Sequence, residues 1–172
     1  MPRILSGRVV AYLLILLVFD LSLVPAIRIQ MVQPILLYLM VLHTAFQWGI
    51  QKAVPMAIVI GLLRDFSGSQ FFGIETASLI IASTVLNVIV QKIDRESAVT
   101  RIAVSFVFVF SVLMLSGLFP ALVGAPVALT LHTFLISAAV ACYTSVLTPI
   151  FSTVTSRWFR ERAPMKQYEL FR

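Results

Sequence analysis

Five charged residues stand apart from the rest of this chain because they lie within or beside apolar segments. They are three acids and two bases, namely Asp20, Arg28, Arg64, Asp65 and Glu75. An ionisable side chain at the depth of a membrane helix is a candidate functional group by default, and such groups commonly pair. Two interpretations of Asp20 therefore stay open: a functional acid, or a structural ion pair with Arg64 or Arg28.

The densest run of special residues lies between positions 61 and 73. Asp65 stands where a helix should end, and the Ser-Gly-Ser turn at 67–69 follows it. An aspartate in that place can cap the next turn through backbone N–H groups. Gly61 and Gly73 predict a close approach of the two flanking helices. The simplest interpretation is a tight hairpin with an ion pair.

The sequence offers no catalytic or metal-binding constellation. His43 and His132 are isolated, with no Cys or carboxylate at ligand spacing, so we expect both to be core or interhelical hydrogen-bonding residues. The motifs G-x-S-x-G, G-x-x-x-x-G-K-[ST] and H-E-x-x-H do not occur. Cys142, the single cysteine, is expected to be a small packing residue. We predict a protein that is not an enzyme and has no cofactor or metal, with an intramembrane enzyme as the weakest alternative.

Small side chains recur at intervals of four near the end of the chain. They are Thr133, Ser137, Ala141 and Ser145. Such a ridge on one helix face allows close backbone approach in lipid, either within the same bundle or against a partner's membrane helix. The preceding apolar segment instead carries Phe106, Phe108 and Phe110, a bulky surface suited to lipid or to a partner's groove.

The distribution of charge defines the elements that must position these residues. No Asp, Glu, Lys or Arg occurs between Arg28 and Lys52 or between Arg101 and Arg157, and only 12% of the chain is charged, against roughly 25% in soluble domains. The apolar runs are continuous rather than alternating, which favours membrane-spanning helices. We predict an all-α integral membrane protein, a six-transmembrane-helix bundle over 1–156 with a basic and aromatic cytoplasmic tail over 157–172. The helices are expected at about 7–26, 31–48, 50–66, 72–91, 100–119 and 127–153.

The basic residues predict the orientation of this bundle. With both termini inside, 13 Lys and Arg residues all lie on the cytoplasmic side except Arg28 and Arg64, as the positive-inside rule requires. The net charge of +6 is thereby explained without nucleic acid, and the aromatic tail is expected to bind anionic lipid. Within the helices, Pro34 should lie in the first turn of the second, and Pro120 in the turn after the fifth.

The segment GLLRDFSGS at 61–69, followed by FGI at 72–74, resembles the signature of the MreD family. In that family a G-[LF]-L-x-D-x-x-[SG] run ends the third helix and a glycine opens the fourth. The matching positions here are Gly61, Asp65, Gly68 and Gly73, none of them catalytic. Arg64 departs from the pattern, since the family usually has an apolar residue there, and the loop at 70–72 lacks the common proline. Size and six-helix hydropathy agree over nearly the whole chain.

The resemblance implies a scaffold of the bacterial cell-elongation machinery in the inner membrane. Its expected partner is MreC, which has one membrane helix, and RodA, a class B penicillin-binding transpeptidase and MreB complete the set. The implied fold is similar to the substrate-binding S component of energy-coupling-factor transporters. The alternative function is therefore an S-component-like binder of a small solute, in which Asp20, Arg64 and Glu75 would supply the polar groups of an outward cavity.

Overall fold

The computed structural model describes residues 7–22, 32–68, 72–90, 97–122 and 130–158. The fold is all-α. Its six helices are α1 (Gly7–Ser22), α2 (Leu36–Trp48), α3 (Ile50–Gly68), α4 (Ile74–Val90), α5 (Ala98–Leu122) and α6 (Leu131–Trp158). The all-α class and the number of helices predicted from the charge-free segments are confirmed for this part of the chain.

The α2 helix forms the centre of the bundle. It contacts each of the other five helices, and every residue from Leu37 to Ala45 is buried. A helix that is apolar on all sides can be stable only when neighbours cover it completely. The segment LLYLMVLHTAF of α2 carries no charged side chain, so this helix suits the central, fully covered position.

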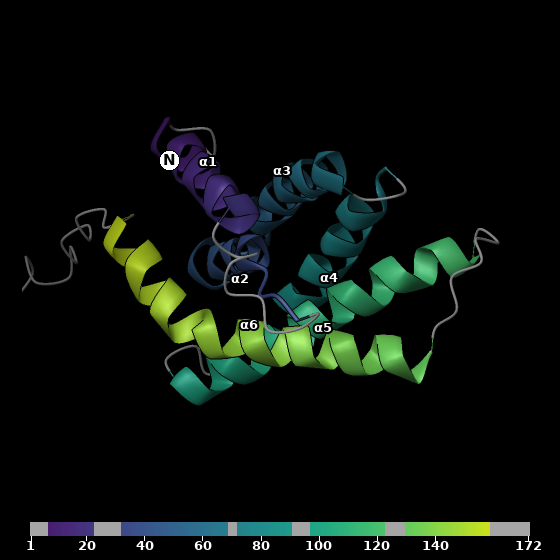
Figure 1. Cartoon of the computed structure of the whole chain (residues 1–172). Helices are drawn as coiled ribbons and strands as arrows, with labels where there is room; N and C mark the ends of the chain where they lie inside the picture. The colour runs from purple at the N-terminus through teal and green to yellow at the C-terminus, as the bar shows by residue number, and fades with distance from the viewer. Residues whose placement is uncertain (1–6, 23–31, 69–71, 91–96, 123–129, 159–172) are drawn as a thin grey trace, which may run out of the picture.

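The remaining helices pack around α2 largely as two hairpins. The α3 and α4 helices form one, and α5 and α6, the two longest, lie side by side in opposite directions in the other (Figure 1). The start of α1, the start of α5 and the end of α6 lie on the left of this view. The end of α5 and the start of α6 lie on the right. Successive helices thus run back and forth between two ends of one bundle.

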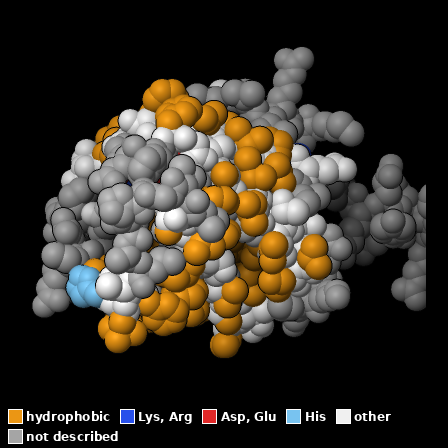
Figure 2. Space-filling view, turned by 90° about the vertical axis from the view of Figure 1, so that its right-hand side faces the viewer, with side chains coloured by type: hydrophobic (Ala, Val, Ile, Leu, Met, Phe, Trp, Pro, Cys, Tyr) orange, Lys and Arg blue, Asp and Glu red, His pale blue; other side chains and the backbone are white. Residues whose placement is uncertain are grey.

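Among the described residues, two helices are long and apolar enough to cross a membrane. The segments that meet this test are Val99–Ala121 in α5 and Leu131–Trp158 in α6, while the apolar parts of α1, α2 and α4 are shorter. Figure 2 shows hydrophobic side chains spread across the described part of one face of the molecule. Many large apolar side chains on α1, α4, α5 and α6 are exposed, which suits contact with lipid rather than water.

Several predicted boundaries are wrong by up to five residues. The α2 helix begins at Leu36, so Pro34 precedes it instead of lying in its first turn. The α5 helix continues to Leu122, so Pro120 lies inside its last turn, where neighbouring side chains keep it buried. The α6 helix continues through Trp158 and takes up the first two residues of the predicted tail. The rest of that tail, 159–172, lies outside the described residues.

Three predictions about single side chains are also wrong. His132, near the start of α6, and Cys142 are exposed instead of packed in the core. Phe108 is buried, so of the three phenylalanines only Phe106 and Phe110, which are partly exposed, can contribute to the outer surface of α5. The rings of these two phenylalanines stack with centroids 6.0 Å apart.

Candidate functional site

Asp65 joins α3 to the first turn of α4. Its Oδ1 accepts a hydrogen bond from the backbone N–H of Glu75 at 3.1 Å, and its Oδ2 accepts from the N–H and hydroxyl of Thr76 at 3.2 and 2.6 Å. The first N–H groups of a helix have no partner within the helix, and a carboxylate there also complements the helix dipole. The cap predicted from the sequence is present, and its side chain is only 5% exposed.

The two glycines of this hairpin serve different purposes. At Gly61 a Cβ atom would lie 2.5 Å from the Cα of Thr76, so only glycine lets α3 and α4 pack this closely. Gly73 has open space around it but adopts a φ of +92°, which side chains with a Cβ rarely accept. The predicted close approach is therefore confirmed at Gly61 and wrong at Gly73, which forms the turn instead.

Asp20 performs a second capping role, on α2. Its Oδ2 lies 3.7 Å from Arg64 Nη1, and its Oδ1 accepts a hydrogen bond from the backbone N–H of Leu36 at 3.1 Å. The residue at the N-cap of α2 is Ile35, which has no side-chain oxygen to offer. The ion-pair interpretation of Asp20 is supported by this geometry, and the cap on α2 is an addition that sequence reasoning missed.

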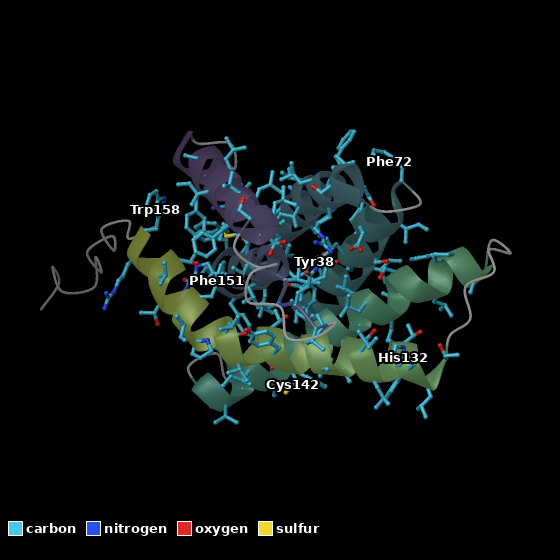
Figure 3. All side chains as sticks on the ribbon, in the orientation of Figure 1. Tyr38, Phe72, His132, Cys142, Phe151 and Trp158 are labelled. Atoms are coloured by element: carbon cyan, nitrogen blue, oxygen red, sulfur yellow. The ribbon has the colours of Figure 1, made fainter. Side chains whose placement is uncertain are left out.

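Tyr38 and Glu75 complete the group. The Tyr38 hydroxyl donates a hydrogen bond to Glu75 Oε2, and the Arg64 guanidinium lies 5.6 Å from the Tyr38 ring centroid. Tyr38 belongs to α2 and is fully buried, and Figure 3 shows it near the middle of the bundle. We name Asp20, Tyr38, Arg64, Asp65 and Glu75 the acid–arginine cluster. Tyr38 was missed because nothing in an apolar run indicates which tyrosine will face a carboxylate on another helix.

The chemistry of the acid–arginine cluster is structural. Its carboxylates accept hydrogen bonds from two helix starts and from Tyr38, and its arginine is held between Asp20 and an aromatic ring. Groups committed to one another in this way fix the ends of α1 to α4 in space. A solute-binding site would instead need convergent polar groups around a cavity.

The remaining predicted site residues fall elsewhere. Ser137, Ala141 and Ser145 of the small-residue ridge are buried within the chain's own fold, and Thr133 is partly exposed. This burial favours the interpretation that the ridge packs inside the bundle. Gly68 is the last residue of α3. Arg28 lies outside the described residues.

Between α4 and α5 runs an open groove of about 740 Å³. Its lining is apolar apart from Ser111, and it includes the half-exposed side chains of Val85 and Val107. The groove follows α5 from Ala103 to Leu118, roughly 22 Å of helix. Its sides are thus the outer faces of one helix from each hairpin.

Comparison with known proteins adds no relative. No family model, no curated protein and no solved structure matches this chain. What the chain does must therefore be inferred from its own residues and geometry.

Proposed function

We propose that this chain is a non-enzymatic scaffold in the bacterial inner membrane, with both termini cytoplasmic. It would bind a single-span partner of the MreC kind and so support rod shape and peptidoglycan synthesis. The proposal rests on the resemblance of segment 61–74 to the MreD signature. RodA, a class B penicillin-binding transpeptidase and MreB are the further partners that this resemblance implies.

The observation that carries the proposal is that three residues of the signature together position one helix, α4. Gly61 allows α4 to approach α3, Asp65 caps the start of α4, and Gly73 makes the turn that leads into it. Such residues are expected in a protein that uses a surface of α4 to bind a partner. That surface is one wall of the apolar groove, which Ile81, Val85 and Ile89 line.

The occupant that fits this groove is the membrane helix of the partner. The groove is apolar and open along its side, and its length approaches the roughly 30 Å of a bilayer core. A helix that lies there would cover the exposed side chains of Val85 and Val107. The paired groups of the acid–arginine cluster would hold the outer rim, where the partner's chain leaves the membrane.

Filling the groove tests this function. Val107→Trp should abolish copurification of an MreC-type protein with the tagged full chain from native membranes, because the indole would occupy the partner's place. Val146→Trp on α6 is the matched control, since Val146 is equally exposed but does not line the groove. Failure of the unmodified chain to copurify such a protein, or equal loss in both variants, would remove the proposed docking site.

The solute-binding alternative predicts a different result. A chain of that kind should retain a vitamin-sized ligand through purification, and the bound molecule would be found by mass spectrometry of the denatured protein. The mutual pairing of Asp20 with Arg64 and of Glu75 with Tyr38 leaves these residues poorly suited to that task.

A further inference from the structure

An exposed pair of aromatic rings lies at the tip of the α3–α4 hairpin. Phe66, near the end of α3, and Phe72, just before α4, meet edge to face with ring centroids 5.0 Å apart. They are 76% and 64% exposed, and Figure 3 shows Phe72 at the margin of the molecule, on the side of the view where α5 ends and α6 begins. We name these two residues the aromatic tip. Exposed aromatic rings that gather in one place indicate an apolar contact outside the bundle.

The charges that flank the aromatic tip are committed to the interior of the bundle. Asp65 is 5% exposed and caps α4, and Glu75 accepts the hydrogen bond of the buried Tyr38. Between these two acids, positions 66–74 carry no charged side chain. The tip therefore offers no ionic group to a charged protein surface, and it suits apolar surroundings bordered by neutral polar groups.

The length of the hairpin indicates what surrounds the tip. Lys52, at the start of α3, has its ammonium 5.0 Å from the centroid of the Trp48 ring, and both residue types are common at membrane interfaces. From Lys52 to Phe66 the helix rises roughly 21 Å, which is less than the roughly 30 Å of a bilayer core. The 17 residues of α4 rise roughly 25 Å. With Lys52 at the cytoplasmic interface, as the predicted orientation requires, the aromatic tip ends among the lipids of the outer leaflet.

An exposed apolar stripe on α3 leads to the tip. Val59, Leu62 and Phe66 follow one another at intervals of three and four, so they share one face of the helix. All three are exposed, and none of them lines the groove between α4 and α5. Acyl chains that cover Val59 and Leu62 would therefore reach the aromatic tip without a break.

We propose that the aromatic tip inserts into the outer leaflet and anchors the α3–α4 hairpin at the boundary between headgroups and acyl chains. Phenylalanine rings bind this boundary through the apolar area that they bury there. A hairpin shorter than the bilayer draws the leaflet toward its end, and the tip fixes the depth at which the two meet. This proposal requires that the bundle lies in a membrane in the predicted orientation, but it does not depend on a role in cell elongation.

The test measures the depth of the aromatic tip in vesicles. Trp48→Phe and Trp158→Phe first remove the two tryptophans of the full chain, and Phe66→Trp then places a single fluorescent indole at the tip. The chain is reconstituted into phosphatidylcholine vesicles that carry bromine either near the headgroup end or near the methyl end of the acyl chains. The shallow bromine should quench Phe66→Trp about twofold more strongly, because interfacial side chains lie within roughly 10 Å of the headgroup boundary. Phe72→Trp should give the same order and keeps the test valid if Phe66→Trp does not fold.

Val59→Trp in the same background is the matched control. Val59 is also exposed and lies on the same face of α3, roughly 10 Å deeper along the helix, so the deep bromine should quench it more strongly. The same order of quenching in Val59→Trp and Phe66→Trp would overturn the proposal. So would an indole at position 66 that iodide in the water quenches and neither lipid does, which would indicate a surface open to a soluble partner.

Discussion

Two polar regions lie at opposite ends of α2 and differ in how their groups are paired. One is the acid–arginine cluster, and the other is a pocket of about 370 Å³ that His43, Gln47 and Arg101 line, which we name the Arg101 pocket. In the cluster, each acid has a partner in Arg64, Tyr38 or a helix start. In the pocket, the ring of the buried His43 has no hydrogen bond within the described part of the chain. Polar groups that satisfy one another stabilise a fold, whereas a buried polar group without a partner adds no such stability. The cluster is therefore a joint between helices, and His43 is not part of one.

The largest effect expected at the joint comes from a single methyl group. Gly61→Ala should lower the free energy of unfolding by more than about 3 kcal/mol, because the new Cβ would lie 2.5 Å from the Thr76 backbone and overpacking of this kind forces helices apart. The shift would also pull Thr76 away from Asp65. Denaturant unfolding of the chain in detergent measures it. Gly7→Ala, with nothing within 4 Å, should change little, and equal effects at both glycines would contradict the close approach.

Removal of the α4 cap should have the next largest effect. Asp65→Ala leaves two backbone N–H groups and the Thr76 hydroxyl without this acceptor, which should cost about 2 kcal/mol. The same unfolding measurement applies. Ser67→Ala is the control, since the Ser67 hydroxyl is exposed and bonds only within its own helix. A loss below about 0.5 kcal/mol in Asp65→Ala would mean that the cap contributes little to the joint.

Much of the joint could be predicted from the sequence, because its signals are local. Asp65 precedes a turn signal, and the spacing to Gly73 fixes a hairpin, so the cap on α4 was within reach. Arg64 is one of the two partners that the sequence predicts for Asp20, because charged side chains in apolar helices commonly pair. By contrast, the cap on α2 joins Leu36 to Asp20, which lies 16 positions earlier on another helix. No local sequence pattern at Ile35 predicts this contact.

The Arg101 pocket could not be predicted, because its residues come from three helices whose packing the sequence does not specify. His43 was expected in the core or in an interhelical hydrogen bond. It is buried, but the hydrogen bond is absent among the described residues. In the sequence, Arg101 is only one of the basic residues that predict the orientation of the bundle. A missing partner becomes visible only when the neighbours of a side chain are known.

The ion pair of the joint sharpens the comparison through a double-mutant cycle. Asp20→Asn and Arg64→Gln should each destabilise the bundle, and the double variant should be more stable than additivity predicts by about 1 kcal/mol. The amide of Asn can still accept the hydrogen bond from Leu36, so the cycle isolates the charge pair. Asp20→Asn combined with Lys52→Gln should be additive. Additivity in the Asp20 and Arg64 cycle would mean that the pair at 3.7 Å contributes no coupling.

The smallest effect on stability, and the most informative, is expected at His43. His43→Leu should leave the free energy of unfolding within about 0.5 kcal/mol of the unmodified chain, because the leucine fills a similar space and removes a buried polar group that has no hydrogen bond among the described residues. Tyr38→Phe, five residues earlier on the same helix, should instead destabilise by about 1 kcal/mol, since Glu75 loses its donor.

If His43→Leu were as strongly destabilised as Tyr38→Phe, His43 would belong to a joint like that of Tyr38. The contrast between the two ends of α2 would then be lost.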